Sequence, residues 1–91
     1  MSEWIYSRQG LSATVTIETV PCLVKGWVCN ADLTGNPILR DGANDVFTLP
    51  QAVIGDSANY DATRFVTNLI LVDDGSGSVT ILYKLMEEAH G

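Results

Sequence analysis

The chain has 91 residues, enough for one domain, and carries 5 Lys and Arg against 11 Asp and Glu, a net charge of −6. Nucleic-acid binding needs Lys and Arg to replace phosphate counterions, and the five cations here are scattered along the sequence without a cluster. We therefore expect no nucleic acid as a partner, and no anionic membrane surface either.

Residues 1–12 differ from the rest of the chain. Trp4, Ile5 and Tyr6 form a short apolar group flanked by polar residues. The segment is either a first strand at a sheet edge or an arm that docks on a neighbouring subunit, and the pattern does not choose between them. Because Trp and Tyr are enriched at interface anchors, these three residues are candidates for a protein interface.

The next two runs predict strands of different exposure. Residues 13–20 alternate between apolar and polar side chains, which is typical of a strand half exposed to water, and Pro21 ends it. Residues 22–30 are apolar on both faces, which indicates a central or covered strand. In a regular strand Cys22 and Cys29 would lie roughly 23 Å apart on opposite faces. They should therefore be two buried thiols and not a disulfide.

Three shorter signals follow. Residues 36–40 predict a short strand that opens with a proline, and Asp41-Gly42 is a turn pair able to close a hairpin. Residues 45–54 are interrupted by Pro50, so we expect a short strand that bends.

The last third of the sequence alternates between polar connections and apolar runs. Residues 55–62 form the longest polar connection, with Tyr60 as its one large side chain. The remaining predictions are the most apolar strand at 64–72, a Gly-Ser loop at 73–78, a closing strand at 79–83 and a tail at 85–91 with helical propensity.

Short strands separated by turn residues every eight to twelve positions predict an all-β fold, an antiparallel β-sandwich or a small barrel, and we favour the sandwich. We expect an arm or edge strand at 1–12, the sandwich domain at 13–84 and a C-terminal tail at 85–91.

Catalytic and metal-binding constellations are missing from the pattern. His90 is the single histidine and lies next to the C-terminus, where a general base would be poorly held. Zinc would need about four clustered ligands. Asp73, Asp74 and Ser76 offer oxygen ligands without the spacing of a calcium loop, so a turn is the favoured interpretation and calcium the alternative. We therefore predict no enzyme, no cofactor and no metal site.

The aromatic side chains allow two interpretations. Trp4, Tyr6, Trp27 and Tyr60 could line a sugar-binding face, or they could belong to the core and to subunit contacts. Aromatics so far apart in sequence favour the second interpretation. Trp27 and Tyr60 therefore join the interface candidates.

No apolar run approaches the roughly 20 residues that span a bilayer. The first residues also lack the basic and apolar regions of a cleaved signal peptide. We expect synthesis and assembly in a cytoplasm.

Five runs follow one another in order: GWVCNA at 26–31, ILRDG at 38–42, Leu49-Pro50, NLILV at 68–72 and VTILY at 79–83. This order resembles that of small bacteriophage virion proteins, over about two thirds of the chain, from Cys22 to Tyr83.

The resemblance implies a β-sandwich of jelly-roll type, displayed in many copies as a capsid decoration or cement protein. The partners would be the major capsid protein or other virion subunits, and the protein would form a homo-oligomer, with a trimer favoured. A place in the neck or tail, or a receptor-binding module for carbohydrate, is the alternative.

Overall fold

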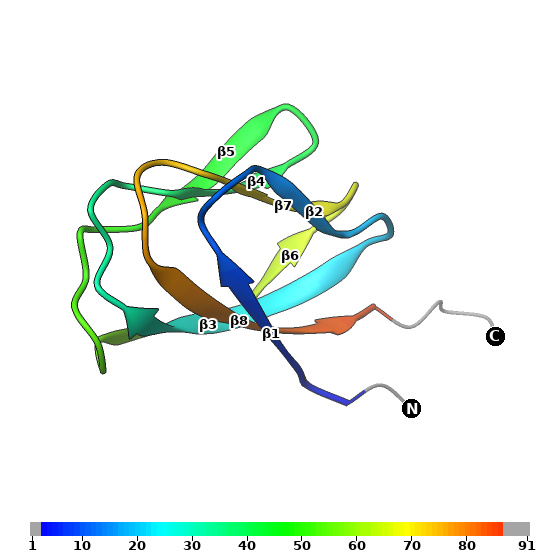
Figure 1. The fold of residues 1–91 in the computed structure, drawn as a ribbon. Helices are drawn as coiled ribbons and strands as arrows, with labels where there is room; N and C mark the ends of the chain where they lie inside the picture. Colours follow the sequence, from blue (N-terminus) through cyan, green and yellow to red (C-terminus); the bar gives the residue numbers. More distant parts are fainter. Residues whose placement is uncertain (1–2, 87–91) are drawn as a thin grey trace, which may run out of the picture.

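The computed structural model describes residues 3–86, which form eight β-strands in two antiparallel sheets (Figure 1). Within residues 3–86 there is no helix, so the all-β prediction is confirmed. The strands are β1 (Ile5–Gly10), β2 (Val15–Glu18), β3 (Cys22–Ala31), β4 (Ile38–Asp41), β5 (Asn44–Thr48), β6 (Ser57–Phe65), β7 (Leu69–Val72) and β8 (Ser78–Leu85).

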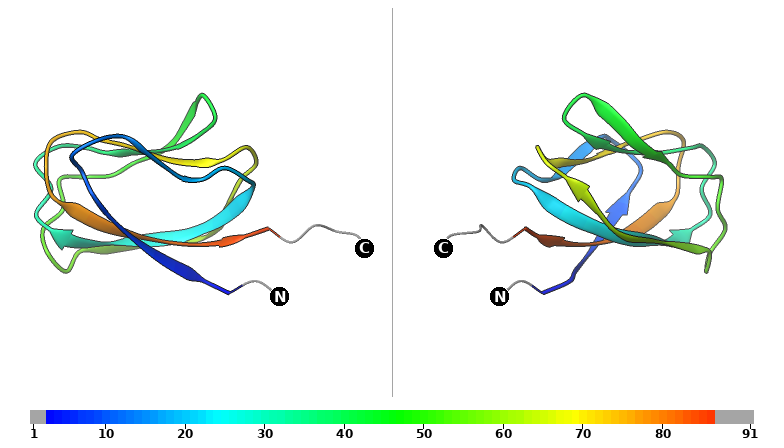
Figure 2. Two further views of the ribbon diagram at one scale, coloured as in Figure 1. Left: turned by 45° about the vertical axis from the view of Figure 1, so that its right-hand side comes forward. Right: turned by 180° about the vertical axis from the view of Figure 1, so that it is seen from behind.

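The strand pairs are nested around the turn between β4 and β5. β4 pairs with β5, β3 with β6, β2 with β7 and β1 with β8, as in one long antiparallel hairpin. Rolling up this hairpin also places β3 beside β8 and β4 beside β7. The result is a first sheet in the order β1-β8-β3-β6 and a second in the order β2-β7-β4-β5, which lie as two layers (Figure 2).

One hydrophobic core fills the space between the layers. Alternate residues of each central strand point inward, and Val79, Ile81 and Tyr83 of β8 are buried together, as the sequence predicts. The other fully buried large side chains are Val24, Leu39, Leu49, Phe65, Leu69 and Leu71. Burying one such side chain contributes about 1.5–3 kcal/mol, so this layer holds the fold together.

Strand β3 is central in its sheet, as predicted, but it is not regular. Its register with both neighbours shifts between Val24 and Gly26, so Lys25 is an extra residue in a β-bulge. After Val24 the bulge therefore exchanges the positions that point into the core with those that point outward. Cys22 and Cys29 consequently both face the core, which corrects the expectation of opposite faces, while the prediction of two free buried thiols is confirmed.

The two thiols should be unreactive in the native protein. Burial, with the nearby charges of Glu18 and Asp41, raises the pKa of Cys22 to about 12, and burial also raises the pKa of Cys29. Since only the thiolate attacks an alkylating or disulfide reagent, we expect no labelling in buffer at about pH 8 and labelling of both thiols in denaturant. Rapid labelling of either cysteine in the folded protein would contradict this burial.

Strand β6 occupies most of the segment that the sequence predicts to be a polar loop. Ser57 and Asn59 point outward while Ala58 and Tyr60 point inward, so the segment is an amphipathic edge strand. Asp61 and Ala62 have φ values of 59° and 61°, and they bulge out before the strand resumes. The predicted loop at 55–62 is therefore wrong from residue 57 onward.

The apolar run 64–72 is not one strand. β6 ends at Phe65, three residues cross to the other layer, and β7 begins at Leu69. The crossing is held by a carboxylate from β4, because Asp41 accepts hydrogen bonds from the backbone N–H groups of Val66 and Thr67 at 3.0 and 2.8 Å. This partner lies 25 residues away in sequence, where a local pattern cannot reveal it.

The two ends of the described chain are both strands of the first sheet. β1 pairs with β8 over its whole length, so residues 5–10 form an edge strand and not a free arm. Leu85 belongs to β8, which corrects the helical tail at that residue. The remainder of the predicted tail, 87–91, lies outside the described residues.

Candidate docking face

The outer surface of the first sheet carries two of the five interface candidates, Trp4 and Tyr6, together with most of the cations. Directly paired residues of antiparallel strands share a face, and β8 buries Val79, Ile81 and Tyr83. The residues between them therefore point outward, together with their partners. We call this surface the docking face; it comprises Trp4, Tyr6, Arg8, Leu23, Lys25, Val28, Ser57, Asn59, Arg64, Thr80, Leu82 and Lys84.

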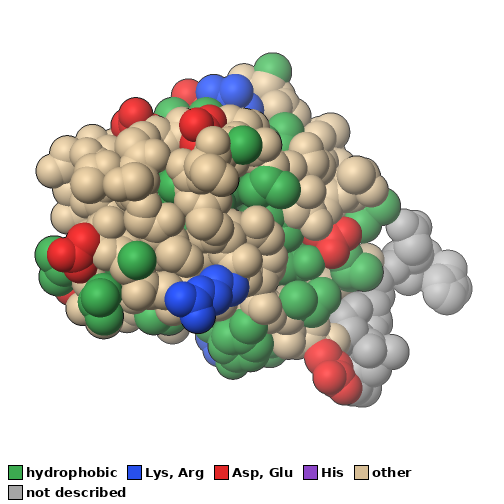
Figure 3. Space-filling view, in the orientation of Figure 1, with side chains coloured by type: hydrophobic (Ala, Val, Ile, Leu, Met, Phe, Trp, Pro, Cys, Tyr) green, Lys and Arg blue, Asp and Glu red, His purple; other side chains and the backbone are tan. Residues whose placement is uncertain are grey.

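Four of the five cations of the chain lie on the docking face: Arg8, Lys25, Arg64 and Lys84. The four strands of this sheet contain one carboxylate, Asp61. In the orientation of Figures 1 and 3 the first sheet is the lower layer, and Figure 3 shows Lys and Arg atoms beside hydrophobic ones there. The expectation that the cations are scattered is thus wrong in space, although it is correct along the sequence.

The remaining cation, Arg40, lies on the second sheet, where its Nε is 2.6 Å from Asp45 Oδ1. Both side chains are partly exposed, so this ion pair contributes less than about 1 kcal/mol. With Arg40 paired on the second sheet, the four remaining cations make the strands of the first sheet the basic part of an acidic protein.

Trp4 connects two of these cations. The Nζ atoms of Lys25 and Lys84 lie 5.2 and 4.9 Å from the centre of its ring. A Lys ammonium over an aromatic ring contributes about 0.5–1 kcal/mol at an exposed site. Trp4 therefore holds two positive charges at one place on the surface, beside the start of β1.

Trp4, Ile5 and Tyr6 do not form one apolar group in the structure. Tyr6 is 69 % exposed on the docking face, opposite Leu82 of β8. Ile5 pairs with the buried Tyr83 and is directed to the other side of the sheet, where the edge leaves it 38 % exposed. Trp4 and Tyr6 are consequently the surface candidates of this segment.

Trp27 and Tyr60 lie elsewhere, on the core side of the sheet. Trp27 is 3 % exposed, and its indole N–H donates a 2.6 Å hydrogen bond to the Tyr60 hydroxyl. The Tyr60 ring stacks on Phe47 of the opposite layer with 3.7 Å between ring centres, which closes that side of the molecule. Both residues therefore follow the core interpretation, and Trp27 offers almost no surface to a partner.

This placement separates the four aromatic candidates for a sugar-binding surface. Trp4 and Tyr6 lie at the β1 edge of the first sheet, while Tyr60 lies on β6 at the opposite edge. The four rings therefore do not share one surface.

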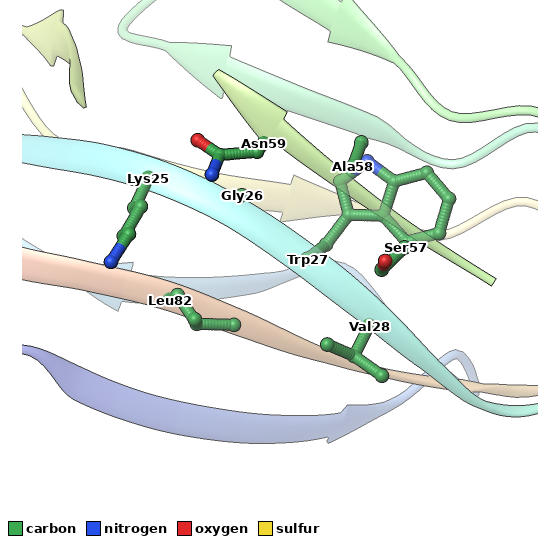
Figure 4. A pocket seen from close by; sticks show the side chains of 8 residues that line it. All are labelled: Lys25, Gly26, Trp27, Val28, Ser57, Ala58, Asn59 and Leu82. Carbon is green, nitrogen blue, oxygen red and sulfur yellow. The ribbon is translucent and has the colours of Figure 1, made fainter. Parts of the chain in front are cut away.

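A shallow pocket of about 400 Å³ indents the docking face between β3, β6 and β8. Figure 4 shows the Lys25, Val28 and Leu82 side chains gathered between β3 and β8. Asn59 and Ser57 of β6 complete the wall on the other side. We call this pocket the groove; its lining combines apolar side chains with a lysine and two polar side chains.

The loops joining β1 to β2, β3 to β4, β5 to β6 and β7 to β8 meet at one end of the molecule. Backbone hydrogen bonds connect them, from Leu33 to Ala52 at 2.8 Å and from Thr34 to Ser76 at 3.1 Å. These loops carry Asp32, Asp56, Asp73 and Asp74 and no Lys or Arg. Carboxylates are visible at this end in Figure 3.

The two aspartates of the Gly-Ser loop have protein partners. Asp73 Oδ1 accepts a 2.5 Å hydrogen bond from the Thr14 hydroxyl, and Asp74 Oδ2 accepts a 2.8 Å bond from the backbone N–H of Asn36. Within the described residues there is no group of three His, Cys, Asp or Glu placed to hold a metal ion. These contacts fit the interpretation of the aspartates as turn residues.

Between residues 3 and 86 no helix is long and apolar enough to cross a membrane. Comparison of the chain with protein-family models, with curated proteins and with solved structures finds no match.

Proposed function

We propose that this protein is a non-catalytic structural subunit of a bacteriophage virion, one that decorates the shell and stabilises it by binding capsid subunits. It would act as a homo-oligomer, in keeping with the trimer that the sequence resemblance implies. The observation that carries the proposal is the docking face, where four cations, the exposed Tyr6 and the partly buried Trp4 lie on one side of a protein of net charge −6.

A β-sandwich of jelly-roll type is part of the same proposal. Its support is the strand order, because a nested hairpin rolled into sheets β1-β8-β3-β6 and β2-β7-β4-β5 has the eight strands and the paired Greek-key connections of that architecture. Jelly rolls recur in viral shells, and they present a broad sheet surface on which another protein can dock.

The composition of the docking face suits a protein partner better than a nucleic acid. Four cations on a net acidic chain give weak attraction to a phosphate backbone. Tyr6 instead supplies an exposed aromatic surface on the same strand as Arg8 and close to Trp4. An acidic partner surface with an apolar patch would complement this arrangement, since opposite potentials speed encounter and fix orientation.

Co-sedimentation with virion shells tests the proposal. Shells assembled from the major capsid protein of the same virus should carry the protein with them in a gradient. We expect Tyr6→Asp and Arg8→Glu each to reduce the bound fraction about tenfold, and added salt to weaken binding.

Substitution is a cleaner test than deletion of residues 1–11, because deletion would remove strand β1 and expose the edge of β8. Val66→Asp is a matched control, since Val66 is 58 % exposed in the turn between β6 and β7, away from the docking face. If the docking-face variants bind shells as well as this control, the proposed role is wrong.

A further inference from the structure

The turn between β5 and β6 presents two apolar side chains to solvent. Val53 is 54 % exposed and Ile54 is 67 % exposed. Gly55 follows with a φ of 96°, as a type II turn requires at its third residue. We call Val53 and Ile54 the loop tip.

The loop tip is held rigidly although it contributes little to the core. Asp56 Oδ2 accepts a 3.1 Å hydrogen bond from the Val53 N–H, and Asp32 Oδ1 accepts a 2.9 Å bond from the Ile54 N–H. The Gly55 N–H donates to the Cys29 carbonyl at 3.1 Å. A surface ordered before binding loses little conformational entropy when it docks, so this geometry suits a contact site.

The groove is complementary to the loop tip in charge, and both carry apolar side chains. Val28 and Leu82 contribute apolar side chains to the lining of the groove, and Lys25 contributes a positive charge. The loop tip is apolar and is flanked by the carboxylates of Asp32 and Asp56. An apolar projection with acidic neighbours thus matches an apolar depression with a basic neighbour.

We propose that the loop tip of one copy docks in the groove of a second copy of this chain. The inference rests on the proposed role as an oligomeric structural subunit and names the contact that builds the oligomer. Every copy carries both a loop tip and a groove, so copies of this chain alone can form the contact. Because the contact joins two different surfaces, repetition closes into a ring when the geometry allows it, and a trimer is such a ring.

A charge-swap experiment on the purified full chain tests the contact. We expect wild type to self-associate over about 10–200 µM in sedimentation velocity, and Ile54→Lys and Lys25→Glu each to weaken association at least about tenfold. Ile54→Lys sets a cation against Lys25, and Lys25→Glu sets a carboxylate against the acidic loop tip. Mixing the two variants should restore association of one variant with the other, since the new lysine then meets the new glutamate, while a closed ring of three would keep one mismatched contact.

Two controls separate this inference from the proposed function. Val66→Lys makes the same kind of change as Ile54→Lys at an exposed residue elsewhere, and Arg8→Glu reverses a docking-face charge outside the groove. Both should associate as wild type does. A wild-type monomer at every concentration, or a mixture that stays monomeric, would overturn the loop-tip contact. If the loop-tip contact is overturned in this way, loss of shell binding by Arg8→Glu would still support the decoration role, because shell binding is measured separately.

Discussion

Replacing Asp41 by Ala should destabilise the protein by about 2–4 kcal/mol, one of the two largest effects we expect of a single substitution. The carboxylate is 8 % exposed and accepts hydrogen bonds from the backbone N–H groups of Val66 and Thr67, with a longer one from Asn68 at 3.4 Å. A hydrogen bond to a charged group contributes about 1.5–3 kcal/mol, and its loss leaves partly buried donors without a partner. Urea unfolding measures the difference.

A surface carboxylate of the same hairpin is the control. Asp45 pairs with Arg40 at a half-exposed site, so Asp45→Ala should cost less than about 1 kcal/mol. Equal losses for the two variants would show that Asp41 does not hold the crossing between the layers.

The same carboxylate should make stability depend on pH. Burial alone would raise the pKa of Asp41, but the backbone hydrogen bonds outweigh it and set the pKa below the ordinary value of 3.8. A group whose pKa is lower in the folded state stabilises the protein above its unfolded pKa, and this contribution is lost as the pH falls through the folded value. The stability difference between wild type and Asp41→Asn should therefore be full at about pH 6 and shrink below about pH 4. A difference that stays constant down to about pH 2 would contradict this linkage.

A strand can be predicted from the sequence when the residues that define it lie within the strand itself. The alternation of 79–83 and the apolar character of 22–30 belong to the strands themselves, and both predictions hold. The segment 57–60 also alternates, Ser-Ala-Asn-Tyr, but its inward residues are an alanine and a tyrosine, so a hydrophobicity criterion passes over it. The break at 66–68 depends on Asp41, whose side chain comes from another strand.

The docking face, too, depends on contacts between strands that are far apart in the sequence. Its cations come from four strands, and they share a face only because of the register between those strands. The bulge at Lys25 also determines which residues of β3 point outward after Val24. A sequence pattern indicates which residues of one strand share a face, but it does not indicate how strands pair. Trp4 and Tyr6 could therefore be named as candidates from the sequence. Arg8, Arg64 and Lys84 could not, because only the pairing brings them together.

Gly26 directly follows that bulge, and Gly26→Ala should cost about 3 kcal/mol, the second of the largest effects. A Cβ at this position would overlap the carbonyl oxygen of Ala58 and would lie 3.0 Å from its carbonyl carbon and 3.2 Å from the Asn59 Cα. All three atoms are backbone atoms of β6, and a strand paired along its length cannot move as a side chain can. The methyl group would therefore push β6 away from β3 and disrupt the groove between them.

Gly10→Ala is the matched control for Gly26→Ala, because a Cβ at Gly10 meets nothing within 4 Å and the residue is likewise part of a strand in the first sheet. Alanine loses less backbone freedom on folding than glycine does, so Gly10→Ala should be neutral or stabilising by less than about 1 kcal/mol. Urea unfolding of the two variants separates a steric cause from an entropic one. If both alanines change the free energy of unfolding equally, β6 does not approach β3 as closely as the pairing of Gly26 with Asn59 requires.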